Sequence, residues 1–64
     1  MRVCLNPQGR QVEIDGVSRV EDLLRRLEIL PGTVLVIRGD RLLTDDSRLE
    51  ASDEIELRSV VSGG

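Results

Sequence analysis

The sequence contains no Phe, Tyr, Trp, His or Lys, and its single cysteine is Cys4. Without aromatic side chains it has no stacking platform for single-stranded nucleic acid, and its core must be closely packed aliphatic residues. One cysteine cannot form an intrachain disulfide, which excludes a cystine-stapled secreted scaffold. Without histidine only an oxygen-ligand metal site is conceivable, and the acidic residues lack calcium-loop spacing, so we expect no metal.

Charge and hydropathy exclude further classes of protein. The nine basic residues are all Arg, so no side chain can accept an isopeptide bond, and twelve acidic residues bring the net charge to −3. This balance disfavours a phosphate-binding surface, and we expect no direct nucleic-acid partner. There is no apolar run near 18 residues and no basic segment followed by an apolar run at the N-terminus. We therefore expect a cytoplasmic protein that does not span a membrane.

The 64 residues include 22 branched aliphatic side chains: eight Val, ten Leu and four Ile. A chain of this length supports one domain with one core and buries only about 60% of its unfolded surface. An active-site cleft between domains is therefore excluded.

The N-terminal half predicts a hairpin followed by a helix. Residues 2–6 and 11–15 alternate between polar and apolar side chains around the turn-forming residues 6–9. Ser18 and Glu21 have capping-box spacing, so a helix is expected to begin near Arg19 and to end at Pro31. Its apolar stripe at i, i+3, i+4 and i+7 is typical of a helix packed on a core. The stripe consists of Val20, Leu23, Leu24 and Leu27.

The C-terminal half predicts three more strands. Residues 33–38 form a β-branched, apolar run that indicates a buried strand, and Leu42 and Leu43 suggest a short one. Residues 54–61 alternate, which is typical of a strand with one face in solvent. One helix must then cover one face of one sheet, with the last strand beside the first. The expected fold is α+β, a ubiquitin-like β-grasp with a mixed sheet of four to five strands.

With this order of elements, the turn Gly39-Asp40-Arg41-Leu42 and the ending Val-Val-Ser-Gly-Gly, the sequence resembles the ThiS/MoaD family of ubiquitin-like sulfur carriers. The resemblance covers the whole chain. It implies a β-grasp domain over residues 1–58 and a C-terminal tail over residues 59–64. The expected protein is a carrier and co-substrate rather than an enzyme.

The resemblance also implies a chemistry. An ATP-dependent adenylating enzyme of the ubiquitin-activating type would convert the Gly64 carboxylate to an acyl adenylate, because an ionised carboxylate is a poor electrophile. Sulfur from a persulfide or related donor would displace AMP and leave a thiocarboxylate on Gly64. The chain itself would bind no cofactor, since ATP is used by the partner enzyme. The free carrier is expected to be a monomer.

Particular residues follow from this resemblance. Gly64 is the attachment site for the adenylate and the sulfur. Gly63, Ser62 and Val61 would pass through a narrow channel of the partner, where glycine avoids a side-chain clash. Val36 and Val60 are candidates for a docking patch, with core-edge packing as the other interpretation.

The recipient of the sulfur stays open between the thiamine thiazole, molybdopterin and a thiolated tRNA base. Residues 59–61 are Ser-Val-Val, where molybdopterin-type carriers often have prolines, which favours the thiazole or tRNA branches. The partners would then be the activating enzyme and a sulfur-accepting synthase or thiolation enzyme.

Two other functions compete with sulfur carriage. One is a ubiquitin-like modifier joined through Gly64 to lysines of target proteins, and the other is a TGS-like β-grasp binding module. Other candidate groups are weaker. Cys4 on a strand is typical of a small hydrophobe, and adjacent carboxylates such as Asp45 and Asp46 are typical of solvated turns.

Overall fold

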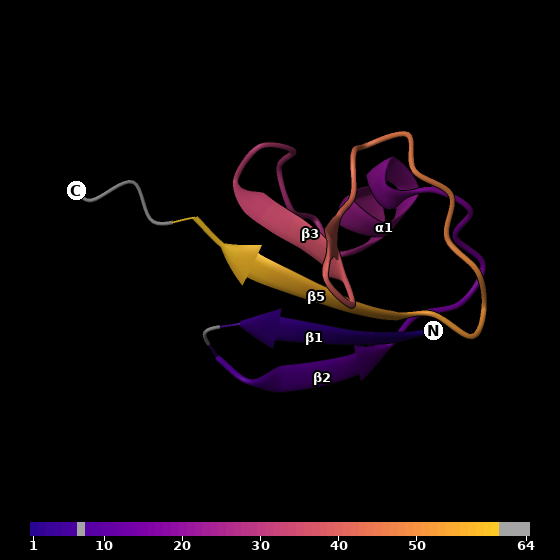
Figure 1. Ribbon diagram of the computed structural model, residues 1–64, viewed down its shortest axis with the longest axis horizontal. Helices are drawn as coiled ribbons and strands as arrows, with labels where there is room; N and C mark the ends of the chain where they lie inside the picture. The colour runs from indigo at the N-terminus through magenta and orange to yellow at the C-terminus, as the bar shows by residue number, and fades with distance from the viewer. Residues whose placement is uncertain (7, 61–64) are drawn as a thin grey trace.

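The computed structural model of the protein describes residues 1–6 and 8–60. Within them, one helix packs against one face of a five-stranded sheet with strand order β2-β1-β5-β3-β4 (Figure 1). The bounds are β1 Arg2–Asn6, β2 Arg10–Glu13, α1 Val20–Arg26, β3 Val34–Arg38, β4 Arg41–Leu42 and β5 Glu54–Ser59. This is the expected α+β, ubiquitin-like β-grasp. The described helix has seven residues and is too short and too charged to cross a membrane.

The sheet is mixed because β1 and β5 run parallel at its centre, whereas the other neighbouring strands are antiparallel. Val3 lies opposite Val12 on β2 and opposite Ile55 on β5. Leu57 on β5 lies opposite Val36 on β3. Paired residues project to the same face, so these apolar side chains form one surface under the helix. The last strand therefore lies beside the first, as predicted.

The core is aliphatic throughout, as the composition predicts. Leu23 of α1 and Val3 of β1 are fully buried, and Leu49 adds a contribution from the segment before β5. The first residue also belongs to the core: the Met1 side chain is buried, and its carbonyl accepts a 2.9 Å hydrogen bond from the Ile14 N–H. The buried apolar residues are Met1, Val3, Val20, Leu23, Leu24, Val36, Leu49, Ile55 and Leu57.

The predicted capping box at the start of α1 is wrong. Arg19 is the N-cap, with extended backbone and no capping hydrogen bond from a side chain. Ser18 precedes the N-cap position by one residue. Its carbonyl accepts a 2.8 Å hydrogen bond from the Leu49 N–H, which holds Ser18 against that distant segment. The free N–H groups of Val20 and Glu21 donate instead to carbonyls of residues 47 and 45, at 3.1 and 2.9 Å. A distant loop therefore caps the helix with its backbone.

The helix also ends by a different mechanism from the predicted stop at Pro31. Its last residue is Arg26, and Glu28 adopts a left-handed conformation with φ of 58°. The Ile29 N–H then reaches back to the Leu24 carbonyl at 2.8 Å. This is the hydrogen bond of a Schellman motif, which ends helices and usually has glycine in the left-handed position.

The strand boundaries differ slightly from the predicted ones. The short strand β4 pairs Arg41 with Arg38 and Leu42 with Ile37, so Leu43 follows it. The pairing of β5 includes Ser59, and the Val60 N–H donates to the Thr33 carbonyl at 3.0 Å. Ser59 and Val60, which the family resemblance assigns to the tail, are thus paired with β3 and hydrogen-bonded to the residue before it. Pro7 of the predicted first turn, and residues 61–64, lie outside the described part of the chain.

Candidate functional site

The sheet has one face covered by α1 and one face without a covering layer in the described structure. Val36 and Leu57 point toward the helix, so the side chains next to them in sequence point the other way. Leu35 and Arg58 form one cross-strand pair on this open face, and Ile37 lies opposite both Glu56 on β5 and Leu42 on β4.

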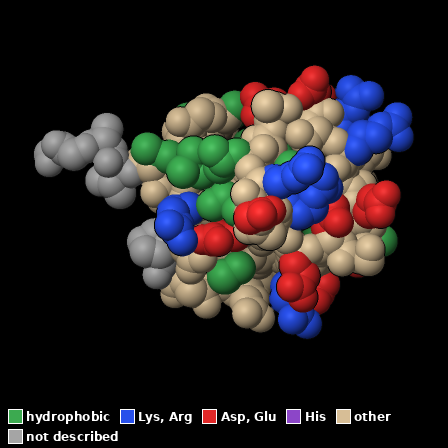
Figure 2. Space-filling view, in the orientation of Figure 1, with side chains coloured by type: hydrophobic (Ala, Val, Ile, Leu, Met, Phe, Trp, Pro, Cys, Tyr) green, Lys and Arg blue, Asp and Glu red, His purple; other side chains and the backbone are tan. Residues whose placement is uncertain are grey.

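Apolar side chains form a band across the open face, from Val60 at the start of the tail over β3 to the edge strand β4. Leu35, Leu42 and Val60 have exposed fractions of 43%, 67% and 51%, and Ile37 between them is partly exposed. We call these four residues the open-face patch. In Figure 2 the apolar surface lies directly beside the C-terminal end of the described chain. Exposed apolar groups of this kind, rimmed by charge, are typical of protein-binding surfaces.

Val36 does not belong to an exposed docking patch, because the residue is only 5% exposed and packs in the core, which was the other interpretation of this position. The apolar run over residues 34–37 does not alternate, so periodicity could not show which of its side chains point inward. The structure places Leu35 and Ile37 on the open face instead. Val60, the other docking candidate, is exposed as expected.

A polar network borders the patch. The Asn6 side-chain N–H on β1 donates to Glu56 Oε2 at 2.9 Å. The Arg58 Nε and Nη2 groups lie 3.1 and 2.9 Å from the same oxygen. These hydrogen bonds, first from Asn6 and then from Arg58, lower the pKa of Glu56 below its ordinary value of 4.5, because they favour the ionised form. The sequence offers no signal for this network, since two of its members are 50 residues apart.

The predicted attachment and channel residues lie outside the described part of the chain. They are Val61, Ser62, Gly63 and Gly64. The structure locates the point from which they continue: Val60 follows β5, which is bonded to β1 on one side and to β3 on the other. A central strand has hydrogen bonds on both edges and so provides a rigid base for the chain that follows it.

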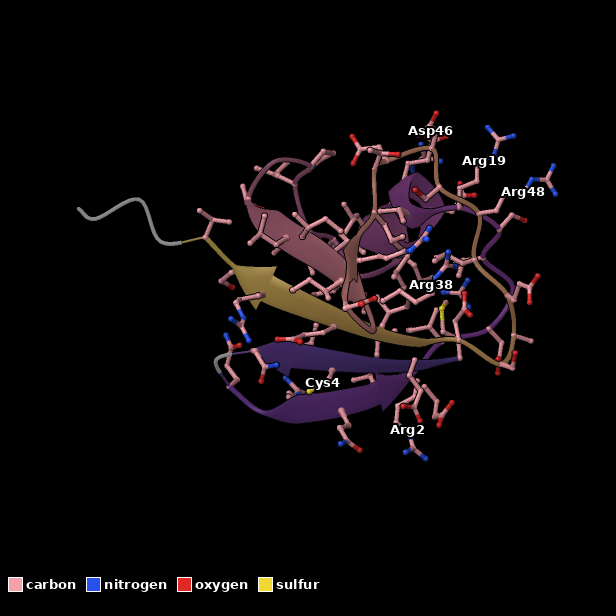
Figure 3. The ribbon with its side chains drawn as sticks, viewed as in Figure 1. Arg2, Cys4, Arg19, Arg38, Asp46 and Arg48 are labelled. Carbon is pink, nitrogen blue, oxygen red and sulfur yellow. The ribbon has the colours of Figure 1, made fainter. Side chains whose placement is uncertain are left out.

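The remaining candidates are structural. Cys4 is half-buried on β1 with its Sγ 3.8 Å from the Asn6 side-chain oxygen (Figure 3). Arg38 donates to Asp53 Oδ2 and to the Arg48 carbonyl, both at 3.1 Å, and so attaches β3 to the loop before β5. The exposed Asp46 accepts a 2.6 Å hydrogen bond from the Thr44 hydroxyl, which lowers the pKa of Asp46. Residues 1–6 and 8–60 hold no cluster of three or more potential metal ligands.

Comparison with known proteins identifies a relative that aligns with the chain over its whole length. No model of a protein family matches the chain. The chain is, however, 37% identical over 65 residues to sulfur carrier protein TtuB of Thermus thermophilus, and the alignment covers all of both sequences. The fold agrees with the relationship, since β1 and β5 are the parallel central strands of a β-grasp sheet. The chain therefore belongs to the ThiS/MoaD-like family of ubiquitin-like sulfur carrier proteins.

Proposed function

We propose that this protein carries sulfur as a thiocarboxylate on Gly64, after an ATP-dependent enzyme of the ubiquitin-activating type has adenylated that residue. The observation that carries the proposal is the alignment with a sulfur carrier protein, which covers both sequences completely at 37% identity. The sequence supports it with a Gly-Gly ending that follows the central strand.

The chemistry requires little from the carrier itself. The terminal carboxylate attacks the α-phosphate of ATP, pyrophosphate leaves, and the acyl carbon becomes an electrophile. A donor persulfide sulfur then forms a C–S bond with that carbon and displaces AMP. A second thiol of the donor system attacks the S–S bond of the resulting acyl disulfide, which leaves the thiocarboxylate on Gly64 and a disulfide on the donor. ATP and the catalytic groups belong to the partner enzyme, and the carrier contributes the carboxylate and a surface by which it is recognised.

The position of Val60 limits how far the reactive end can extend. Ser59 pairs with β3, and the Val60 N–H donates to the carbonyl of Thr33, the residue before β3. Only residues 61–64 are therefore left to extend from the sheet. Four extended residues reach about 14 Å, compared with about 20 Å for the six residues of the predicted tail. The domain must therefore dock close to the entrance of the partner's active site.

The open-face patch is the surface that supports such docking. It includes Val60, so an enzyme that binds the patch can receive the following residues without crossing the rest of the domain. Leu35, Ile37 and Leu42 replace Val36 as docking candidates, and Val60 remains one.

The sulfur would go to an acceptor enzyme that docks the same end of the molecule after the activating enzyme leaves. The residues at positions 59–61, Ser-Val-Val, favour a thiazole-forming or tRNA-thiolating acceptor over a molybdopterin synthase.

Intact-protein mass spectrometry tests this function. The chain is incubated with ATP, a cognate adenylating enzyme and a sulfur donor. We expect a mass increase equal to replacement of one oxygen by sulfur, located on Gly64 by fragmentation. A variant that lacks Gly64 should fold normally and remain unmodified. An unchanged wild-type mass, together with no ATP–pyrophosphate exchange with any adenylating enzyme of the same genome, would reject the proposal.

A further inference from the structure

Arg58 is held in one orientation beside the tail. Its Nε and Nη2 groups both contact Glu56 Oε2, at 3.1 and 2.9 Å. The same oxygen accepts a 2.9 Å hydrogen bond from Asn6 on the neighbouring strand. Three donors from two strands thus meet at one carboxylate oxygen, which orients the Arg58 guanidinium along the sheet.

This arrangement leaves one edge of the guanidinium available. A guanidinium offers two edges that can each bind a carboxylate through paired N–H groups. Glu56 occupies the Nε–Nη2 edge, and in the described residues Arg58 has no other ion pair, so the Nη1–Nη2 edge is open. The Arg58 side chain is 60% exposed, and Leu35 of the open-face patch is its cross-strand neighbour.

Folding stability accounts for only a small part of the role of this network. Exposed ion pairs contribute little to stability, because solvent screens them and the side chains lose rotamer entropy. In a binding site, the same fixation is useful. A guanidinium that is already ordered loses less entropy when it binds a partner, which increases affinity and geometric selectivity.

We propose that Arg58 is a specificity-determining contact of the carrier: its open edge binds a carboxylate on the activating enzyme, beside an apolar cleft that receives the open-face patch. Glu56 and Asn6 are positioning residues that act through Arg58. This inference rests on the proposed function, since it names a contact of the enzyme that adenylates Gly64.

The ligand of Arg58 is a protein carboxylate rather than the phosphate of the adenylate. The acyl adenylate would form on Gly64, six residues after Arg58, or about 20 Å away when that segment is extended into an active site. Ser59 and Val60 continue the sheet from Arg58, so the guanidinium stays with the domain outside that active site. The open edge of the guanidinium presents paired N–H groups and a positive charge, to which a planar carboxylate is complementary.

Steady-state kinetics of the cognate adenylating enzyme test the inference, with carrier concentration varied in ATP–pyrophosphate exchange. Arg58→Glu should raise the KM for the carrier about tenfold or more while kcat stays unchanged, because the contact forms on docking and not in the chemical step. Arg58→Lys should raise KM by a smaller factor, since it keeps the charge and loses the planar edge. Arg26→Glu makes the same change in charge on α1, away from the open face of the sheet, and serves as the control.

Two further readouts separate recognition from a structural role. Glu56→Gln should also raise KM although Arg58 is still present, because the guanidinium is then less well positioned. The difference in KM between wild type and Arg58→Glu should shrink as NaCl is added. A KM for Arg58→Glu within about twofold of that for Arg26→Glu would overturn the inference, because reversing any exposed surface charge can change KM by a factor of that size. If wild type itself undergoes no activation, the proposed function fails instead.

Discussion

Val36 lies directly opposite Leu57 in the β3–β5 ladder, and their side chains are only 5% and 1% exposed. This pair decides the direction of every other side chain on the two strands, because side chains alternate along a strand. It places Leu35 and Arg58 together on the open face. The proposed docking surface of the carrier therefore follows from a buried pair.

The buried pair should dominate stability. Leu57→Ala should lower the free energy of unfolding by about 2–5 kcal/mol, since it leaves a cavity beneath α1. Leu42→Ala, at a side chain that is 67% exposed, should change it by less than about 0.5 kcal/mol. Urea denaturation measures both. An equal decrease in the free energy of unfolding for the two variants would contradict the assignment of the inner and outer faces of the sheet.

The open-face patch should matter for docking and not for folding. The double variant Leu35→Ala, Leu42→Ala should weaken binding to the activating enzyme about tenfold or more, because these side chains would lie at the centre of the interface. Its melting temperature should stay near that of wild type. Isothermal titration calorimetry measures the affinity, and Leu30→Ala, at an exposed apolar residue outside the patch, is the control.

Cys4 offers an internal probe of the same docking. It is half-buried on the open face, where its strand neighbour on β5 is Glu56. A bound enzyme that covers this face should slow alkylation of the thiol by iodoacetamide, whereas the free carrier should react at a rate set by partial burial. Mass spectrometry follows the reaction over time. Unchanged alkylation in a saturated complex would show that the enzyme binds a different surface.

The left-handed Glu28 should be a point of strain. Glu28→Gly should raise the free energy of unfolding by about 0.5–1 kcal/mol, because glycine adopts a φ of 58° without a steric penalty. Glu21→Gly in the first turn of α1 removes the same side chain from helical backbone and should instead destabilise by about 1 kcal/mol. Thermal and urea unfolding measure the two changes. Destabilisation by both substitutions would argue against the Schellman motif.

Stability should fall on acidification. The pKa values of Glu56 and Asp46 are lowered in the folded protein, so the unfolded chain takes up protons at these carboxyls first as pH decreases. Their contribution to the free energy of unfolding is therefore fully present above the ordinary pKa range of carboxyl groups. It is lost as the pH falls through the lowered pKa values of the folded protein. Urea midpoints measured between about pH 7 and pH 3 should decrease, and Glu56→Gln should reduce the dependence. A pH dependence of this variant identical to that of wild type would contradict a role for Glu56.

The local sequence was sufficient for the order of the elements. The hairpin, the apolar stripe of α1 and the alternating last strand all arise from the spacing of apolar residues, which reflects the 3.6- and 2-residue periods of helix and strand. The Gly-Gly ending after that strand indicated the family, which the identity to a sulfur carrier protein confirmed. These features depend on residues close together in the chain.

Tertiary structure decided the details of the candidate site. The direction of Val36 depends on its pairing with Leu57, because a run of apolar residues has no periodicity of its own. The start of α1 is capped by carbonyls of residues 45 and 47 rather than by the nearby Ser18. Arg58 is held through Glu56 by Asn6 from the other end of the sequence. Each depends on contacts between distant segments, which only the packed sheet brings together.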